Sequence, residues 1–147
     1  MRPALPEGLL RLPIAHRALH DLTQRRPENS LPAIHAALAN GYAIEIDVQP
    51  SADGEAMVFH DDTLDRLTEG AGPIRAHNRA VLQRLVVRHS DAPIPTLPQV
   101  LEAVAGRVPL LIEIKDQSGV MGPTDGVLET AVARALTEHA ARAPTVC

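Results

Sequence analysis

Two acidic residues, Glu45 and Asp47, are separated by one residue in a run that alternates apolar and acidic side chains. Residues two apart on a strand project from the same face, so these carboxylates would lie together while Ile44, Ile46 and Val48 point the other way. Such a pair repels itself unless a cation lies between its members, and Mg²⁺ or Ca²⁺ prefers oxygen ligands. A solvent-facing strand of an antiparallel sheet alternates similarly, so the spacing alone leaves both interpretations open.

The run 112–115 repeats this pattern, with Glu113 and Lys115 on one face of another expected strand. In a parallel sheet that helices cover on both faces, charged side chains need an ion-pair partner or a ligand. The second acidic strand therefore favours a functional site. An ion pair from Glu113 to Lys115 or to a neighbouring arginine is the structural alternative.

Two histidines, His16 and His60, each end an apolar run that is expected to be a strand. Barrel and open-sheet enzymes gather reactive groups at the carboxyl ends of strands, and a histidine pair can supply one base and one acid near neutral pH. A single histidine there is more often structural, but two beside an acidic cluster favour catalysis. Arg17 offers a planar fork for phosphate oxygens and equally suits an ion pair with Glu28 or Asp61.

The elements that must position these residues alternate between short apolar runs and helical stretches, a pattern typical of a parallel sheet with crossover helices. The expected strands are 12–16, 43–48, 56–60 and 109–115, with a hairpin turn at Asp53-Gly54 joining the second to the third. The expected helices begin after Asn29 or Ser30, at about 79, after Thr96 and at 125. Residues 61–73 are expected to form a loop, and 144–147 the start of another strand.

Composition limits the class of protein. The 147 residues suffice for one globular unit, and a net charge of −4 without a basic cluster argues against a nucleic-acid partner. The single cysteine, Cys147, excludes an intrachain disulfide. The first residues show neither a signal peptide nor an apolar anchor, which predicts a cytoplasmic protein without an integral membrane segment. Nucleotide-binding and serine-hydrolase motifs are missing from the sequence.

Six motifs, taken in order, resemble those of the glycerophosphodiester phosphodiesterase family. The similarity runs from about residue 12 to 115 and continues more weakly beyond. It implies an α/β fold, a TIM-type (β/α) barrel of the phospholipase C-like phosphodiesterase kind. The motifs are Ile14-Ala15-His16-Arg17, Pro27-Glu28-Asn29-Ser30, Glu45-Ile46-Asp47-Val48, Val58-Phe59-His60-Asp61 with Thr63-Leu64-Asp65-Arg66, Ile94-Pro95-Thr96-Leu97 and Ile112-Glu113-Ile114-Lys115.

The resemblance also implies an activity, the hydrolysis of small-molecule glycerophosphodiesters to glycerol 3-phosphate and an alcohol. In it a glycerol hydroxyl next to the ester attacks the phosphorus and forms a cyclic phosphate, and either histidine can be the base. The implied roles are Mg²⁺ or Ca²⁺ ligands for Glu45, Asp47 and Glu113, an acid/base pair for His16 and His60, and phosphate contacts for Arg17 and Lys115.

Two departures from the family pattern stand out. The family usually has glycine after His-Arg, where this chain has Ala18, and the stretch 19–26 is somewhat long; both predict an altered approach to the ligand. A (β/α)₈ barrel takes about 250 residues, so residues 1–147 are expected to be a partial catalytic domain, about the first half. It would be part of a longer phosphodiesterase or a homodimer joined through open barrel edges. The alternatives are an inactive half-barrel that binds metal and phosphate, and a related phospholipase-type phosphodiesterase.

Overall fold

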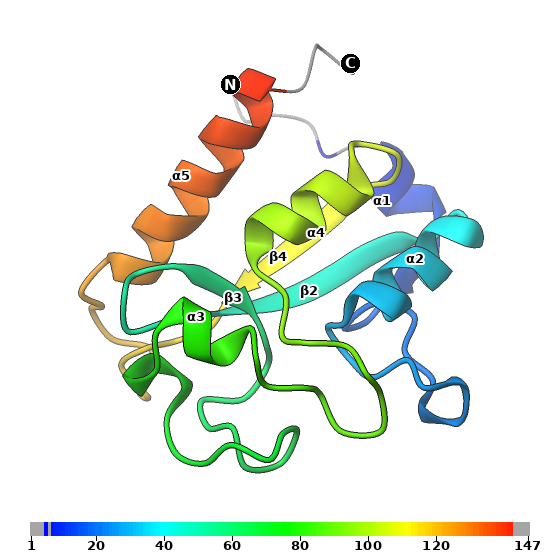
Figure 1. Cartoon of the computed structure of the whole chain (residues 1–147). Coiled ribbons are helices and arrows are strands. Elements are labelled where there is room, and N and C mark those ends of the chain that lie inside the picture. Colours follow the sequence, from blue (N-terminus) through cyan, green and yellow to red (C-terminus); the bar gives the residue numbers. More distant parts are fainter. Residues whose placement is uncertain (1–4, 6, 143–147) are drawn as a thin grey trace.

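The computed structural model describes residue 5 and residues 7–142 (Figure 1). The strand expected at 144–147 lies outside these residues. In chain order the elements, with η for 3₁₀ helices, are α1 (Glu7–Arg11), β1 (Ile14–Ala15), η1 (Leu22–Gln24), α2 (Leu31–Ala39), β2 (Ala43–Pro50), β3 (Ala56–Val58), η2 (Ile74–Ala76), α3 (Arg79–Leu82), α4 (Leu97–Val104), β4 (Leu110–Ile114) and α5 (Val127–Arg142).

The sheet is organised around β2. This strand pairs in parallel with β1 and with β4, and antiparallel with β3, so the hairpin expected at Asp53-Gly54 is confirmed. In the register of the parallel pairs, Ala15 lies opposite Ile44 and Asp47 opposite Glu113. The first strand is shorter than expected, because Pro13 has no N–H for the ladder.

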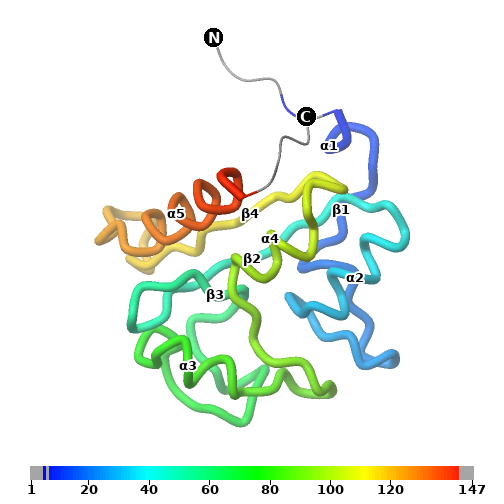
Figure 2. The backbone as a smooth tube through the Cα atoms, turned by 45° about the horizontal axis from the view of Figure 1, so that its top comes forward, coloured from blue at the N-terminus to red at the C-terminus, as the bar shows by residue number. Residues whose placement is uncertain are grey.

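Three helices, α2, α4 and α5, cover one face of the sheet (Figures 1 and 2). Ile44, Ile46 and Val48 are fully buried in the core between the sheet and these helices. Since side chains alternate along a strand, the acidic residues of β2 lie on the opposite face. Helix α2 begins at a Ser30 cap, and α4 at a capping box formed by Thr96 and Gln99.

The segment between β3 and α4 has its own small core. Seven buried apolar side chains pack together there: Met57, Phe59, Leu64, Ile74, Leu82, Val87 and Ile94. Residues 61–73 form a loop, as expected, while the helix expected over 79–86 is the single turn α3. This core includes Phe59 and Leu64, which lie on either side of His60 in the sequence. Their packing fixes the path of the chain after β3 and so the position of His60.

Strand β4 is less covered than β2. All eight residues of β2 are buried, whereas Leu111 and Ile114 of β4 are 47% and 40% exposed. On α5, Val127 and Leu136 are also exposed. No helix among the described residues has both the length and the apolar composition that crossing a membrane requires.

Candidate active site

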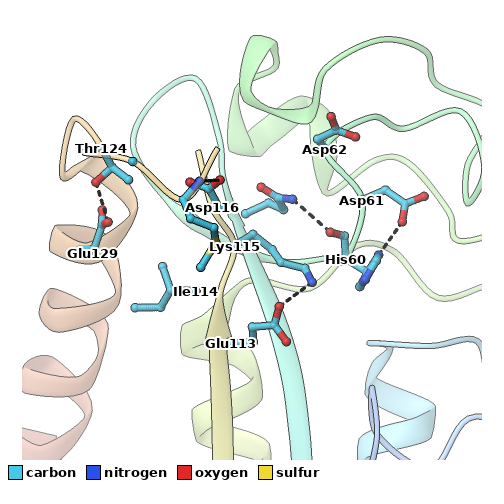
Figure 3. Close-up of a pocket in the computed structure, with 12 residues that line it drawn as sticks. His60, Asp61, Asp62, Glu113, Ile114, Lys115, Asp116, Thr124 and Glu129 are labelled. Atoms are coloured by element: carbon cyan, nitrogen blue, oxygen red, sulfur yellow. Dashed lines mark hydrogen bonds and ion pairs between the residues drawn. The ribbon is translucent and has the colours of Figure 1, made fainter. Parts of the chain in front are cut away.

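A cleft of about 750 Å³ opens beside the carboxyl end of β4, between the sheet and the segment that leads into α5 (Figure 3). Glu113 and Lys115 from the end of β4 line it, together with His60 and Asp61 from the chain after β3 and Gln49 from β2. Residues between β4 and α5 also line it, so four segments that are separate in the sequence meet around one space.

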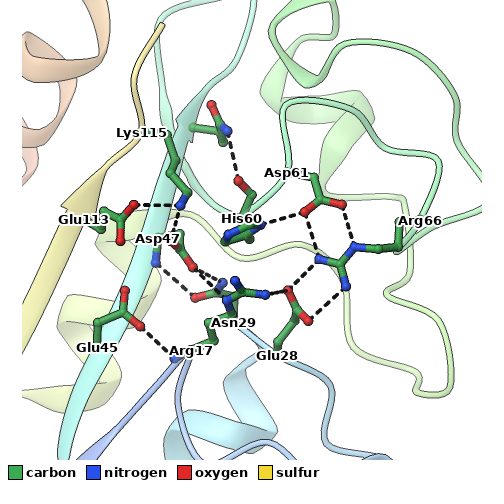
Figure 4. A network of polar contacts seen from close by, with 11 residues as sticks. Arg17, Glu28, Asn29, Glu45, Asp47, His60, Asp61, Arg66, Glu113 and Lys115 are labelled. Carbon is green, nitrogen blue, oxygen red and sulfur yellow. Dashed lines mark hydrogen bonds and ion pairs between the residues drawn. The ribbon is translucent and has the colours of Figure 1, made fainter. Parts of the chain in front are cut away.

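Three carboxylates, those of Glu45, Asp47 and Glu113, converge beside this cleft (Figure 4). One oxygen from each lies within 4.8 Å of the others. Glu45 and Asp47 are 8% and 1% exposed, so the interpretation of β2 as a solvent-facing strand is wrong. The side chain of Glu113 is 56% exposed. The spacing inferred from the sequence therefore does bring the three acids together.

Asp47 is held by residues from three other segments. The Asn29 amide donates from Nδ2 to Oδ2 at 2.9 Å, and the Asp47 N–H donates back to Asn29 Oδ1 at 3.2 Å. The ammonium of Lys115 lies 3.0 Å from Oδ1, and the Arg17 Nε lies 3.7 Å from Oδ2. These partners offset the cost of burying a carboxylate.

Asn29 has a role that the sequence did not assign. It was one of two candidates for the cap of α2, but Ser30 is the cap, accepting the Ala33 N–H. Asn29 instead adopts a left-handed backbone with φ 54°, and its buried side chain is joined to Asp47 by two hydrogen bonds. Asparagine tolerates this conformation better than most residues. The only sequence signal was its place in the Pro-Glu-Asn-Ser motif.

The two carboxylate oxygens of Glu45 have different surroundings. Its Oε2 accepts the backbone N–H of Arg17 at 2.8 Å, while its Oε1 is buried and meets no hydrogen-bond donor among the residues that the structure describes. A buried carboxylate oxygen without a partner is costly. With Asp47 and Glu113 beside it, this oxygen suits a hard divalent cation, so the residues present fit such a group.

Lys115 bridges two of the acids. Its ammonium lies 2.7 Å from Glu113 Oε1 as well as 3.0 Å from Asp47, so the Glu113–Lys115 ion pair considered as the structural alternative is present. Burial by itself lowers the pKa of Lys115, but the hydrogen bonds to Glu113 and Asp47 outweigh it, and the pKa is raised. Lys115 is therefore a permanent cation at the edge of the cleft.

His60 follows the carboxyl end of β3. This strand runs antiparallel to β2, as the expected hairpin requires, and carries the chain back along β2, where the Phe59 N–H donates to the Asp47 carbonyl. The His60 carbonyl accepts from Gln49 Nε2 at 3.0 Å. Its ring Nδ1 lies 2.7 Å from Asp61 Oδ1.

Asp61 is paired with Arg66 as well as with His60. Chiefly through its hydrogen bonds from Arg66, the pKa of Asp61 is lowered to about 2. A carboxylate that is ionised at neutral pH accepts the Nδ1 proton, which leaves Nε2 of His60 as the unprotonated nitrogen of the neutral ring.

His16 and Arg17 lie in the turn after β1. The His16 side chain is exposed, and the Arg17 N–H bound to Glu45 places this turn against β2. Arg17 Nη1 lies 3.2 Å from Glu28, so the ion pair with Glu28 that the sequence allowed is present. The next residue, Ala18, is buried with φ 64°, a left-handed conformation that explains the family's usual glycine.

The architecture defines the class of protein first. Parallel strands followed by helices, with polar residues gathered at the carboxyl ends of the strands, are typical of (β/α)-barrel proteins. Solved structures agree. A phosphodiesterase of Oleispira antarctica in complex with the product sn-glycerol-3-phosphate matches with a TM-score of 0.75 at 32% identity, over 90% of this chain and 55% of that one. A glycerophosphodiester phosphodiesterase of Thermotoga maritima matches with 0.68 at 28% identity, over 86% and 50%.

Sequence comparison identifies the family. Residues 16–146 match the model of the glycerophosphoryl diester phosphodiesterase family, and the chain belongs to this family. The glycerophosphodiester phosphodiesterase of Caldanaerobacter subterraneus is 33% identical over 117 residues, which are 75% of this chain and 46% of that protein. Human glycerophosphodiester phosphodiesterase 1 is 36% identical over 69% of this chain and 33% of its own length. The chain thus spans from a third to about half of these curated relatives.

Proposed function

We propose that this chain carries the cation- and phosphate-binding part of a glycerophosphodiester phosphodiesterase site, and that the reaction is the divalent-metal-dependent hydrolysis of glycerophosphodiesters to glycerol 3-phosphate and an alcohol. The observation that carries the proposal is the convergence of Glu45, Asp47 and Glu113 beside His60 and Lys115, with a buried Glu45 oxygen that has no hydrogen-bond partner among the described residues. The glycerol 3-phosphate in the Oleispira relative supports the substrate class.

The three carboxylates are the proposed ligands of Mg²⁺ or Ca²⁺, which when bound supplies positive charge to the phosphate oxygens. Lys115 and Arg17 are the proposed phosphate contacts. Lys115 already lines the cleft. The buried Nε of Arg17 makes no hydrogen bond to any described residue, although it lies 3.7 Å from Asp47 Oδ2. Both cations would stabilise negative charge that develops on the phosphoryl group.

His60 and His16 are the proposed acid/base pair. One histidine takes the proton of the glycerol hydroxyl next to the ester as its oxygen bonds to phosphorus. The other gives a proton to the alcohol oxygen as its bond to phosphorus breaks. Water then opens the cyclic phosphate to glycerol 3-phosphate. The Asp61 contact, which fixes a proton on Nδ1 of His60, leaves Nε2 able to accept one and favours His60 as the base.

The test measures turnover and cation binding separately. The chain is incubated with glycerophosphocholine, with Mg²⁺ or Ca²⁺ or with a chelator, and released glycerol 3-phosphate is assayed while calorimetry measures cation binding. We expect release only with a divalent cation. Glu45→Gln should lose cation binding, and His60→Ala should lose turnover but keep binding. Glu102→Gln on α4 and His35→Ala on α2, both exposed and outside the cleft, are matched controls.

A second candidate is a cation- and phosphate-binding unit without turnover. It is favoured by the exposure of Glu113 on a half-covered β4, since loosely held groups catalyse poorly. Cation binding by the wild-type chain without any glycerol 3-phosphate release would select this candidate. Absence of binding at millimolar cation would exclude both. The homodimer, one of the two arrangements that the sequence allowed, finds no support in the described part of the chain or in the related structures.

A further inference from the structure

Arg66 joins two loops that are far apart in the sequence (Figure 4). Toward the loop after β3 it donates from Nε to Asp61 Oδ2 at 2.7 Å and from Nη2 to Asp61 Oδ1 at 2.8 Å. Toward the loop before α2 it donates from Nη1 to Glu28 Oε2 at 3.2 Å and from Nη2 to Glu28 Oε1 at 2.9 Å. One guanidinium therefore holds two carboxylates by paired hydrogen bonds.

Each of these carboxylates also contacts a residue of the proposed site. Asp61 lies 2.7 Å from Nδ1 of His60, and Glu28 lies 3.2 Å from Nη1 of Arg17. Arg66 itself is not among the residues that line the main cleft, and four hydrogen bonds to carboxylates already use most of its donors. Its position fits an action through these two carboxylates rather than direct binding of phosphate.

We propose that Arg66 is a positioning residue for His60: its fork fixes the Asp61 carboxylate so that Asp61 accepts the Nδ1 proton, which keeps Nε2 as the nitrogen that exchanges protons. The use of that nitrogen in catalysis rests on the function proposed above. The placement of Nδ1 against Asp61 does not depend on it.

Positioning Asp61 requires the planar guanidinium of Arg66 with its paired N–H donors, and not only its positive charge. Arginine can bind two carboxylates by parallel hydrogen bonds, whereas a lysine ammonium is a point charge without that planar arrangement. The loop itself is anchored independently of Arg66, because Leu64 is fully buried in the small core beneath it. Loss of Arg66 should therefore release Asp61 and His60 without unfolding the loop.

The experiment compares Arg66→Gln and Arg66→Lys with the wild-type chain. Arg75→Gln is the matched control, because Arg75 is as exposed as Arg66 and pairs with a single carboxylate, Asp125. Nitrogen-15 NMR of the histidine side chains reports the tautomer of His60 and needs no turnover. We expect the Nδ1-protonated form in the wild type and in Arg75→Gln, and a mixture of tautomers in both Arg66 variants.

Retention of the Nδ1-protonated form in Arg66→Gln would overturn the proposal. Its retention in Arg66→Lys, together with loss in Arg66→Gln, would overturn the requirement for a fork. Backbone NMR spectra establish that each variant is folded. If Arg66→Gln does not fold, Arg66→Lys decides the outcome, and Asp61→Asn shows the spectrum of a His60 without its carboxylate partner.

The kinetic constants kcat and KM provide a second test. If Arg66 only stabilised the loop, its replacement in a folded variant would leave kcat unchanged. If the wild-type chain turns over glycerophosphocholine, kcat should fall in Arg66→Lys by part of the about 10²- to 10⁴-fold that general acid–base catalysis contributes, with KM little changed. An unchanged kcat would overturn the proposal. If the wild-type chain does not turn over, the proposed activity of this chain fails, while the His60 tautomer still tests the positioning role.

Discussion

The two strands that supply acidic residues differ in how firmly they hold them. On β2, every residue is buried, and Glu45 and Asp47 are bound by Arg17 and Asn29 from other segments. On β4, Glu113 is more than half exposed, and its ion-pair partner is Lys115, two residues away on the same chain segment. The first pair of acids is therefore in place before any ligand arrives.

The difference in burial between the acids of β2 and Glu113 of β4 indicates which part of the site a ligand must order. Buried charges are fixed by several directional partners, whereas an exposed ion pair gains little and moves easily. A cation that binds between the strands would meet preformed ligands on β2 and a mobile one on β4. Substitutions on the two strands should therefore differ in their effects on stability and on cation binding.

Replacing Asp47 by alanine should have the largest effect. Asp47 is the acid on which Asn29, Arg17 and Lys115 converge, and its loss leaves these groups without their buried partner. Removing one member of a buried charge network typically costs about 3–5 kcal/mol. We expect a loss of this order in urea denaturation and no cation binding in calorimetry. A loss of stability below about 1 kcal/mol would contradict the preformed β2 site.

Asn29→Ala should have the next largest effect, because it leaves the buried Asp47 carboxylate short of one donor and the Asp47 N–H without its acceptor. An unsatisfied buried group costs about 1–3 kcal/mol, and more when it is charged. Urea denaturation measures the loss. Asn40→Ala is a control, since Asn40 is exposed and its side chain bonds only within its own helix end. Equal losses in both variants would show that Asn29 has no special role.

The pairing of Asp61 predicts a pH dependence. Its pKa is lowered to about 2, from an ordinary value near 4, chiefly by Arg66. A depressed pKa contributes stability that is complete above the ordinary value and is lost as the pH falls through the folded value. The stability difference between the wild type and Asp61→Asn should therefore be constant above about pH 5 and shrink between about pH 4 and 2. Denaturation at several pH values measures it, and a constant difference would contradict the pairing.

Glu113→Gln should change stability least and cation binding strongly. An exposed ion pair contributes at most about 1 kcal/mol, so the unfolding free energy should stay within that range. Because Glu113 is a proposed cation ligand, however, neutralising its side chain should weaken the cation affinity measured by calorimetry. A destabilisation as large as that of Asp47→Ala would remove the distinction between the two strands.

The sequence predicted those features that depend on neighbouring residues in the chain. Alternation along 43–48 put Glu45 and Asp47 on one face, and the hairpin after Asp53-Gly54 formed as expected, because both depend on residues next to one another in the chain. The family motifs placed Glu113 and His60 at the same site in advance. The sequence also offered Glu28 as a partner of Arg17, but it did not name the partners of Asn29 and Arg66.

Contacts between distant segments became known only from the folded structure. Asn29 meets Asp47 across 18 residues, and Arg66 meets Glu28 across 38. The contact between His60 and Gln49 is likewise one between separate sides of the hairpin. The sequence by itself determined which side chains could do chemistry and on which face of a strand they lie. Which neighbours hold them depended on how the loops fold back over the sheet, because hydrogen bonds form between groups that are close in space, whatever their separation in the chain.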